Sequence, residues 1–115
     1  MTAEDGVFYR LMAVIESRKS ASPDKSYTAK LLRAGLPKIG EKVTEEAAEV
    51  VEAAGEPGDE GRTHTVYETA DLLYHLWVLL AHCGIGLEEV EAELSRRFGI
   101  SGLEEKASRS EKKDP

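Results

Sequence analysis

The sequence predicts an all-α protein, a bundle of about five helices. Apolar residues recur at intervals of three and four along most of the chain, which is the helical period. Aromatic residues make up only 6%, and β-branched residues other than a few valines are scarce, so a sheet is disfavoured. The chain has 115 residues, enough for one domain with a modest core. We therefore expect the bundle to be completed by homo-oligomerisation.

Residues that start and stop helices divide the chain into its expected elements. Ser26 is a typical N-cap, Gly35 ends the helix that follows, and Pro37 suits the first turn of the next. The stretch 55–61, with one proline and three glycines, is the clearest break in the chain. We expect helices over about residues 6–19, 27–34, 36–54, 63–83 and 87–98.

Composition limits the class of partner. A formal net charge of −7 disfavours a nucleic-acid polymer or an anionic membrane, although a divalent cation can bridge acidic protein to a nucleotide. The longest apolar run, 72–81, is far too short to span a bilayer. The acidic N-terminus is unlike a signal peptide, and the single cysteine, Cys83, indicates a reducing compartment and a small buried side chain. We expect a cytoplasmic protein with a folded domain over 1–99 and a charged, disordered tail over 100–115.

The third expected helix carries an acidic pair beside its apolar stripe. At about 100° per residue, one narrow stripe forms, which we expect to face the core: Ile39, Val43, Ala47, Val50 and Ala54. Glu46 and Glu49 then lie on its flank, with Lys42 between them in angle. Glu45 points into solvent. Residues three apart on a helix have Cβ atoms about 5–6 Å apart, so the two carboxylates of the pair can reach one point.

The fourth expected helix repeats this spacing with Glu68 and Asp71. From Leu72 onward it is apolar nearly all round, which indicates burial against more than one neighbour. Four carboxylates brought together would repel one another, and a divalent cation with oxygen ligands removes that repulsion. Two antiparallel helices that each donate an acidic pair would form such a Mg²⁺ site, able to orient a phosphoryl group and activate water. The alternative is that these acids only solubilise the helix surfaces.

Four stretches of the sequence closely match one known family. They read SYTAKLL at 26–32, GLPKIGEKVTEEAAE at 35–49, ETADLLYHL at 68–76 and ELSRRFG at 93–99. In this order and spacing they resemble phosphoribosyl-ATP pyrophosphohydrolase, over about residues 7–99. That family belongs to the MazG-like all-α NTP pyrophosphohydrolases, whose E-x-x-E and E-x-x-D signature matches the acidic pairs Glu46 with Glu49 and Glu68 with Asp71.

The resemblance implies a reaction and a set of site residues. It implies hydrolysis of phosphoribosyl-ATP to phosphoribosyl-AMP and pyrophosphate, the second step of histidine biosynthesis, with Mg²⁺ as cofactor. It also implies a homodimer or higher homo-oligomer, and it assigns the catalytic and metal-binding roles to Glu46, Glu49, Glu68 and Asp71.

Several cations are candidates for holding substrate phosphates. Lys30 and Lys38 lie on either side of the Gly35 turn, where they are equally well explained as ordinary solvated cations. Solvation is the favoured interpretation for Arg33. Lys42 either contacts a phosphate or forms a salt bridge with Glu46 or Glu49.

The remaining polar and aromatic candidates are interpreted as structural. We expect His75 to be a hydrogen-bonded core residue and Trp77 to serve packing rather than base stacking. His64, His82 and Cys83 have no spacing that suggests a zinc site. Two alternative functions stay open: a MazG-type enzyme that acts on ordinary dNTPs, and a non-catalytic helical interaction module.

Overall fold

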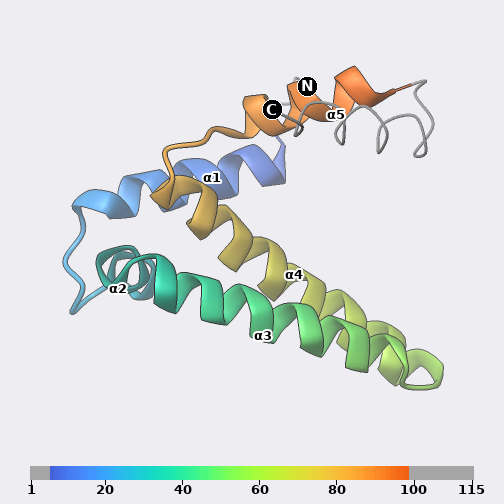
Figure 1. The fold of residues 1–115 in the computed structure, drawn as a ribbon. Coiled ribbons are helices and arrows are strands. Elements are labelled where there is room, and N and C mark those ends of the chain that lie inside the picture. Colours follow the sequence, from blue (N-terminus) through green and yellow to red (C-terminus); the bar gives the residue numbers. More distant parts are fainter. Residues whose placement is uncertain (1–5, 99–115) are drawn as a thin grey trace, which may run out of the picture. The chain divides into compact units, whose positions relative to one another are not determined.

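A computed structural model describes residues 6–98, and all regular structure within that range is helical (Figure 1). The all-α prediction is confirmed, whereas the expectation for the tail over 100–115 falls outside the described residues. The chain forms two compact units, one ending at Ile85 and the other beginning at Gly86. The elements are α1 (Val7–Ser17), the 3₁₀ turn η2 (Arg18–Ser20), α2 (Tyr27–Ala34), α3 (Leu36–Ala54), α4 (Gly58–His82) and α5 (Leu87–Arg97).

The first two helices follow the predicted signals closely. α1 buries Met12 and Ile15, and its last turn tightens into η2 rather than continuing as α-helix to residue 19. Ser26 caps α2, since its hydroxyl accepts a hydrogen bond from the main-chain N–H of Ala29 at 3.1 Å. α2 ends at Gly35, whose φ of 88° lies in the region that favours glycine.

α3 and α4 form an antiparallel hairpin, which is the most extensive helix contact of the first unit (Figure 1). Ile39 and Ala53 of α3 are buried, as are Val78 and Ala81 of α4. α4 also packs against α1 and α2, so its C-terminal half is covered by more than one neighbour, as its apolar composition predicted.

The connection between α3 and α4 is shorter than the predicted break at 55–61. α4 begins at Gly58, so only three residues separate the helices. Pro57 occupies the N-cap position with an extended backbone, and a proline there starts a helix rather than interrupting one. Asp59 and Glu60 then lie in the first turn, where negative charge complements the helix dipole.

The inward face of α3 also differs from the predicted stripe. Glu46 and Ala53 are buried, whereas Ala47 and Ala54 are exposed. The inward positions follow the alternating four-and-three spacing of a heptad: 39, 43, 46, 50 and 53. Glu46 therefore lies within the contact between α3 and α4, and not on the flank of an apolar stripe as predicted.

One apolar face of the hairpin is uncovered in the single chain. Ala54, Val66 and Ala70 are exposed, and Val66 retains 67% of its accessible surface. These three residues border one shallow hollow of about 670 Å³, and we call this surface the outer face.

Two expectations concern the ends of the last long helices. Cys83, expected to be buried, is exposed because it is the C-cap residue of α4 and no longer faces the core. α5 ends at Arg97, with Phe98 as its C-cap. In the described range no single helix is both long and apolar enough to cross a bilayer; only α4 and α5 counted together reach that length and composition.

Candidate metal centre between α3 and α4

The two acidic pairs meet where α3 packs on α4. Glu46 and Glu68 are buried, with 7% and 8% of their surface accessible, while Glu49 and Asp71 are half-buried. One carboxylate oxygen from each of Glu46, Glu68 and Asp71 lies within 4.8 Å of the other two. The short connection forces α3 and α4 to run antiparallel, which brings the i, i+3 acids of the two helices to the same level.

The electrostatics of this cluster favour added positive charge. Burial raises the pKa of Glu46 to about 7, helped by a hydrogen bond with Glu49 and by the negative charges nearby. The pKa of Glu68 is also raised, first by burial and then by its hydrogen bond with Glu49. Two carboxyls can share a hydrogen bond only when one of them is protonated. Without a cation, the clustered carboxyls therefore stay protonated at pH values at which isolated carboxyls have lost their protons.

One oxygen of the cluster has no partner. Glu46 Oε2 is buried and receives no hydrogen bond from any described residue. Leaving a buried carboxylate oxygen unpaired is costly, so either a proton or a cation is required there. Because the available donors are all carboxylate oxygens, the residues fit a hard cation such as Mg²⁺.

His75 borders the cluster but is already hydrogen-bonded. Its Nδ1–H donates to the main-chain carbonyl of Asp71 at 2.9 Å, and its Nε2 accepts from the hydroxyl of Tyr27 at 3.1 Å. The bond to a carbonyl places a proton on Nδ1, and in the corresponding neutral tautomer Nε2 is the acceptor. The residue is 6% exposed, which confirms the interpretation of His75 as a hydrogen-bonded core residue.

His64 was not expected near the site. Its Nδ1 lies 2.9 Å from Oε1 of Glu56, and its Nε2 lies 3.4 Å from Oε2 of Glu68. The hydrogen bond to Glu56 is the main cause that raises the pKa of His64. The i, i+4 spacing of His64 and Glu68 is a signal in the sequence that predicts this contact.

The candidate phosphate-binding lysines differ in their partners. The sequence leaves Lys42 open between a phosphate contact and a salt bridge with Glu46 or Glu49. Its Nζ lies 3.3 Å from Oε2 of the exposed Glu45, so the salt bridge that it forms is with Glu45 instead. Lys38 pairs with Glu41 at 3.6 Å. Lys30 and Arg33 are exposed, and neither forms an ion pair with a described acid.

Trp77 serves packing, as expected. Its Nε1–H donates to the main-chain carbonyl of Phe8 at 2.9 Å, and the two rings contact at a centroid distance of 5.9 Å. It therefore ties α4 to α1.

Two antiparallel helices bring acidic side chains together in an all-α fold. This arrangement is typical of helical proteins that hold a hard cation beside an anionic ligand. Residues 8–98 match the family model described as Phosphoribosyl-ATP pyrophosphohydrolase. The chain therefore belongs to the phosphoribosyl-ATP pyrophosphohydrolase family.

Individual relatives agree with this assignment, and each bears the name phosphoribosyl-ATP pyrophosphatase. One from Rhodopirellula baltica is 54% identical over 91% of this chain and 88% of its own length. One from Methylococcus capsulatus is 54% identical over 90% of this chain and 95% of its own. One from Trichlorobacter lovleyi is 54% identical over 96% of this chain and 100% of its own. Both the dNTP-directed and the non-catalytic alternatives are disfavoured.

Proposed function

We propose that this protein hydrolyses phosphoribosyl-ATP to phosphoribosyl-AMP and pyrophosphate, the second step of histidine biosynthesis, with Mg²⁺ held between α3 and α4. The reaction is inferred from the chain's membership of the family. The location of the site is inferred from the convergence of three carboxylates within 4.8 Å. One water is consumed: its oxygen bonds to phosphorus while the bridging P–O bond between the α and β phosphates breaks.

Glu46, Glu68 and Asp71 are proposed to hold the cation. Their converging oxygens support this role, as does the unpartnered Oε2 of Glu46. A bound Mg²⁺ would neutralise charge on the substrate phosphates and polarise the anhydride linkage. The raised pKa of Glu46, caused first by its burial, indicates that binding of the cation would displace protons from the carboxyl cluster.

Glu49 is proposed to orient the attacking water and accept its proton. It is half-buried and raises the pKa of both Glu46 and Glu68, after their burial, yet it adds no oxygen to the converging trio. A carboxylate at the edge of a cation site, open to solvent, can hold a water by hydrogen bonding without occupying a ligand position.

Lys30, Lys38 and Lys42 remain proposed contacts for the polyphosphate. Lys42 is supported best, because its pKa is raised first by its hydrogen bond with Glu45 and further by the charges of Tyr27 and Glu46. It therefore lies between the α2 region and the acidic cluster. A surface ion pair is weak, so Lys42 can leave Glu45 for a phosphate at little cost.

A homodimer or larger homo-oligomer and a cytoplasmic location complete the proposal. The apolar outer face, with Ala54, Val66 and Ala70 exposed, supports association with another copy. Substrate and products are small anions, and none of the proposed roles requires a membrane or a nucleic-acid polymer.

Pyrophosphate release from phosphoribosyl-ATP tests the proposed function. We expect release with Mg²⁺, none with excess EDTA, and none from Glu46→Ala. In cells that lack this step of histidine biosynthesis, the wild type should restore growth without histidine and Glu46→Ala should not. Equal rates on dATP and phosphoribosyl-ATP would instead support the MazG-type activity.

A further inference from the structure

A second hollow lies beside the start of α2, with a volume of about 480 Å³. We call it the α2 pocket. No acidic side chain lines it. Its lining consists of Arg18, Ala21, Lys25, Ser26, Tyr27 and Thr28.

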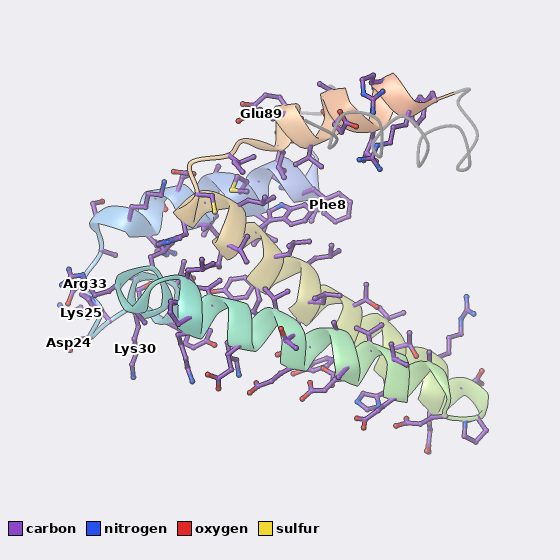
Figure 2. The ribbon with its side chains drawn as sticks, in the orientation of Figure 1. Phe8, Asp24, Lys25, Lys30, Arg33 and Glu89 are labelled. Carbon is purple, nitrogen blue, oxygen red and sulfur yellow. The ribbon has the colours of Figure 1, made fainter. Side chains whose placement is uncertain are left out.

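The two cations of the α2 pocket are free to bind an anion. Neither Arg18 nor Lys25 forms an ion pair with an acid in the described part of the chain. By contrast, Lys19 on the same 3₁₀ turn pairs with Glu16 at 2.9 Å. Figure 2 shows Lys25, together with Lys30 and Arg33, around α2 and the loop that precedes it. An unpaired guanidinium beside an ammonium group is well suited to a phosphate dianion.

Tyr27 connects this pocket to the acidic cluster. Its ring lines the pocket and is half exposed, while its hydroxyl donates to Nε2 of His75 at 3.1 Å. Nδ1 of that imidazole lies 3.8 Å from Oε1 of Glu46. The ring of Tyr27 is further held by stacking on the ring of Tyr74, with centroids 6.3 Å apart and planes 20° apart. Only one imidazole ring therefore separates the pocket wall from the proposed cation site.

Phosphoribosyl-ATP carries phosphate at two separate places. Its triphosphate requires a cation-bearing site, which the acids between α3 and α4 would form. Its phosphoribosyl group ends in a single phosphate, which carboxylates repel and free basic side chains attract. Ordinary nucleoside triphosphates lack that second phosphate, so a site for it would distinguish the two classes of substrate.

We propose that the α2 pocket binds the phosphate of the phosphoribosyl group through Arg18 and Lys25, and thereby selects phosphoribosyl-ATP over ordinary nucleoside triphosphates. This inference rests on the proposed function, since it assigns one part of that substrate. Tyr27 forms the wall between the phosphoribosyl end and the reacting phosphates.

Two nucleoside monophosphates of different size provide a test that involves no turnover: the product phosphoribosyl-AMP, and AMP. Phosphoribosyl-AMP and AMP differ only by the phosphoribosyl group, and their dissociation constants can be measured by calorimetry with Mg²⁺ present. The variants are Arg18→Ala with Lys25→Ala, and Lys19→Ala as the matched control. All three side chains are exposed, so circular dichroism should show unchanged folding.

We expect the double variant to bind phosphoribosyl-AMP at least about tenfold more weakly and AMP as before, because charged hydrogen bonds to one phosphate are lost. The control should bind both like the wild type. Equal weakening for AMP would mean that these cations bind the nucleotide's own phosphate, and no change would mean that they bind neither; both results overturn the proposal. A wild type that binds phosphoribosyl-AMP and AMP equally also overturns it, even if phosphoribosyl-ATP is hydrolysed. Failure to hydrolyse phosphoribosyl-ATP would instead refute the proposed function.

Discussion

Nδ1 of His75 lies 3.8 Å from Oε1 of Glu46, yet it donates its proton to the main-chain carbonyl of Asp71 at 2.9 Å. The imidazole therefore fills the space beside the acid while its Nδ1 proton is directed to the main chain. Glu46 keeps a buried oxygen with no described partner, next to other carboxylates. A buried, unpaired acid beside other carboxylates favours a cation at this position.

Asp71 is proposed to bind the cation and Glu49 to orient the attacking water, so conservative substitutions of the two should have different effects. Asp71→Asn should abolish both turnover and Mg²⁺ binding, because it removes the negative charge of one of the three converging carboxylates. Glu49→Gln should lower kcat by about a hundredfold or more while Mg²⁺ still binds, because only the group that orients the water is lost. Pyrophosphate release and calorimetry with MgCl₂ measure the two properties separately.

Glu52→Gln is the matched control for these variants. Glu52 is exposed on α3, and its change should alter neither property. Loss of Mg²⁺ binding in Glu49→Gln would show that Glu49 is a ligand, and full activity in both variants would refute the site.

The raised pKa of Glu46 predicts how the stability of the metal-free protein depends on pH. Burial, more than any other cause, raises this pKa from 4.5 to about 7, so the folded state holds a proton that the unfolded state has released. The stabilisation that this proton on Glu46 gives the folded state is complete below pH 4.5 and is lost as pH rises through 7. At about 1.4 kcal/mol per pKa unit, the free energy of unfolding should fall by up to about 3 kcal/mol.

Urea denaturation in EDTA at a series of pH values measures this slope. In Glu46→Gln the slope should be much smaller, and saturating Mg²⁺ should remove it from the wild type because the cation replaces the proton. An identical slope in Glu46→Gln would assign the effect to another group.

Gly61 is expected to tolerate no side chain. A Cβ atom built there would lie 2.1 Å from the main-chain oxygen of Glu56, so the connection between α3 and α4 would have to move. We expect Gly61→Ala to lower the free energy of unfolding by about 2–3 kcal/mol. Gly40→Ala is the control: its Cβ would meet nothing within 4 Å inside α3, so it should stabilise by up to about 1 kcal/mol. Urea midpoints that shift in the same direction would contradict this account.

The hydroxyl of Tyr27 is expected to contribute to stability through His75. Tyr27→Phe leaves the buried Nε2 of His75 without its donor, at a cost of about 1 kcal/mol. Tyr67→Phe, at a side chain that is 66% exposed, should change thermal stability very little. Equal melting temperatures for the two variants would indicate that the bond to His75 contributes nothing.

Helix identity and the grouping of the acids could be predicted from the sequence because both depend on short-range spacing. Ser26 and Gly35 delimit α2 as expected, and the i, i+3 pairs reach one place once a short connection makes the helices antiparallel. The rotation of α3 about its axis could not be predicted. Alanine suits either face of a helix, so Ala47 and Ala54 defined an apolar stripe that the contact with α4 does not use.

The start of α4 and the environment of His64 depend on tertiary contacts. The glycines near Pro57 favour a loop locally, but Gly61 allows the first turn of α4 to approach Glu56 closely. That approach also places Glu56 beside His64. Spacing alone predicts the contact of His64 with Glu68, but not this second partner.

Both halves of the acidic cluster belong to one hairpin of one chain. Each chain therefore carries all three of the proposed ligands, and diluting any assembly of copies until they separate should leave the affinity for magnesium and the number of ions per chain unchanged. Any turnover lost on dilution would then come from substrate contacts that a neighbouring copy contributes.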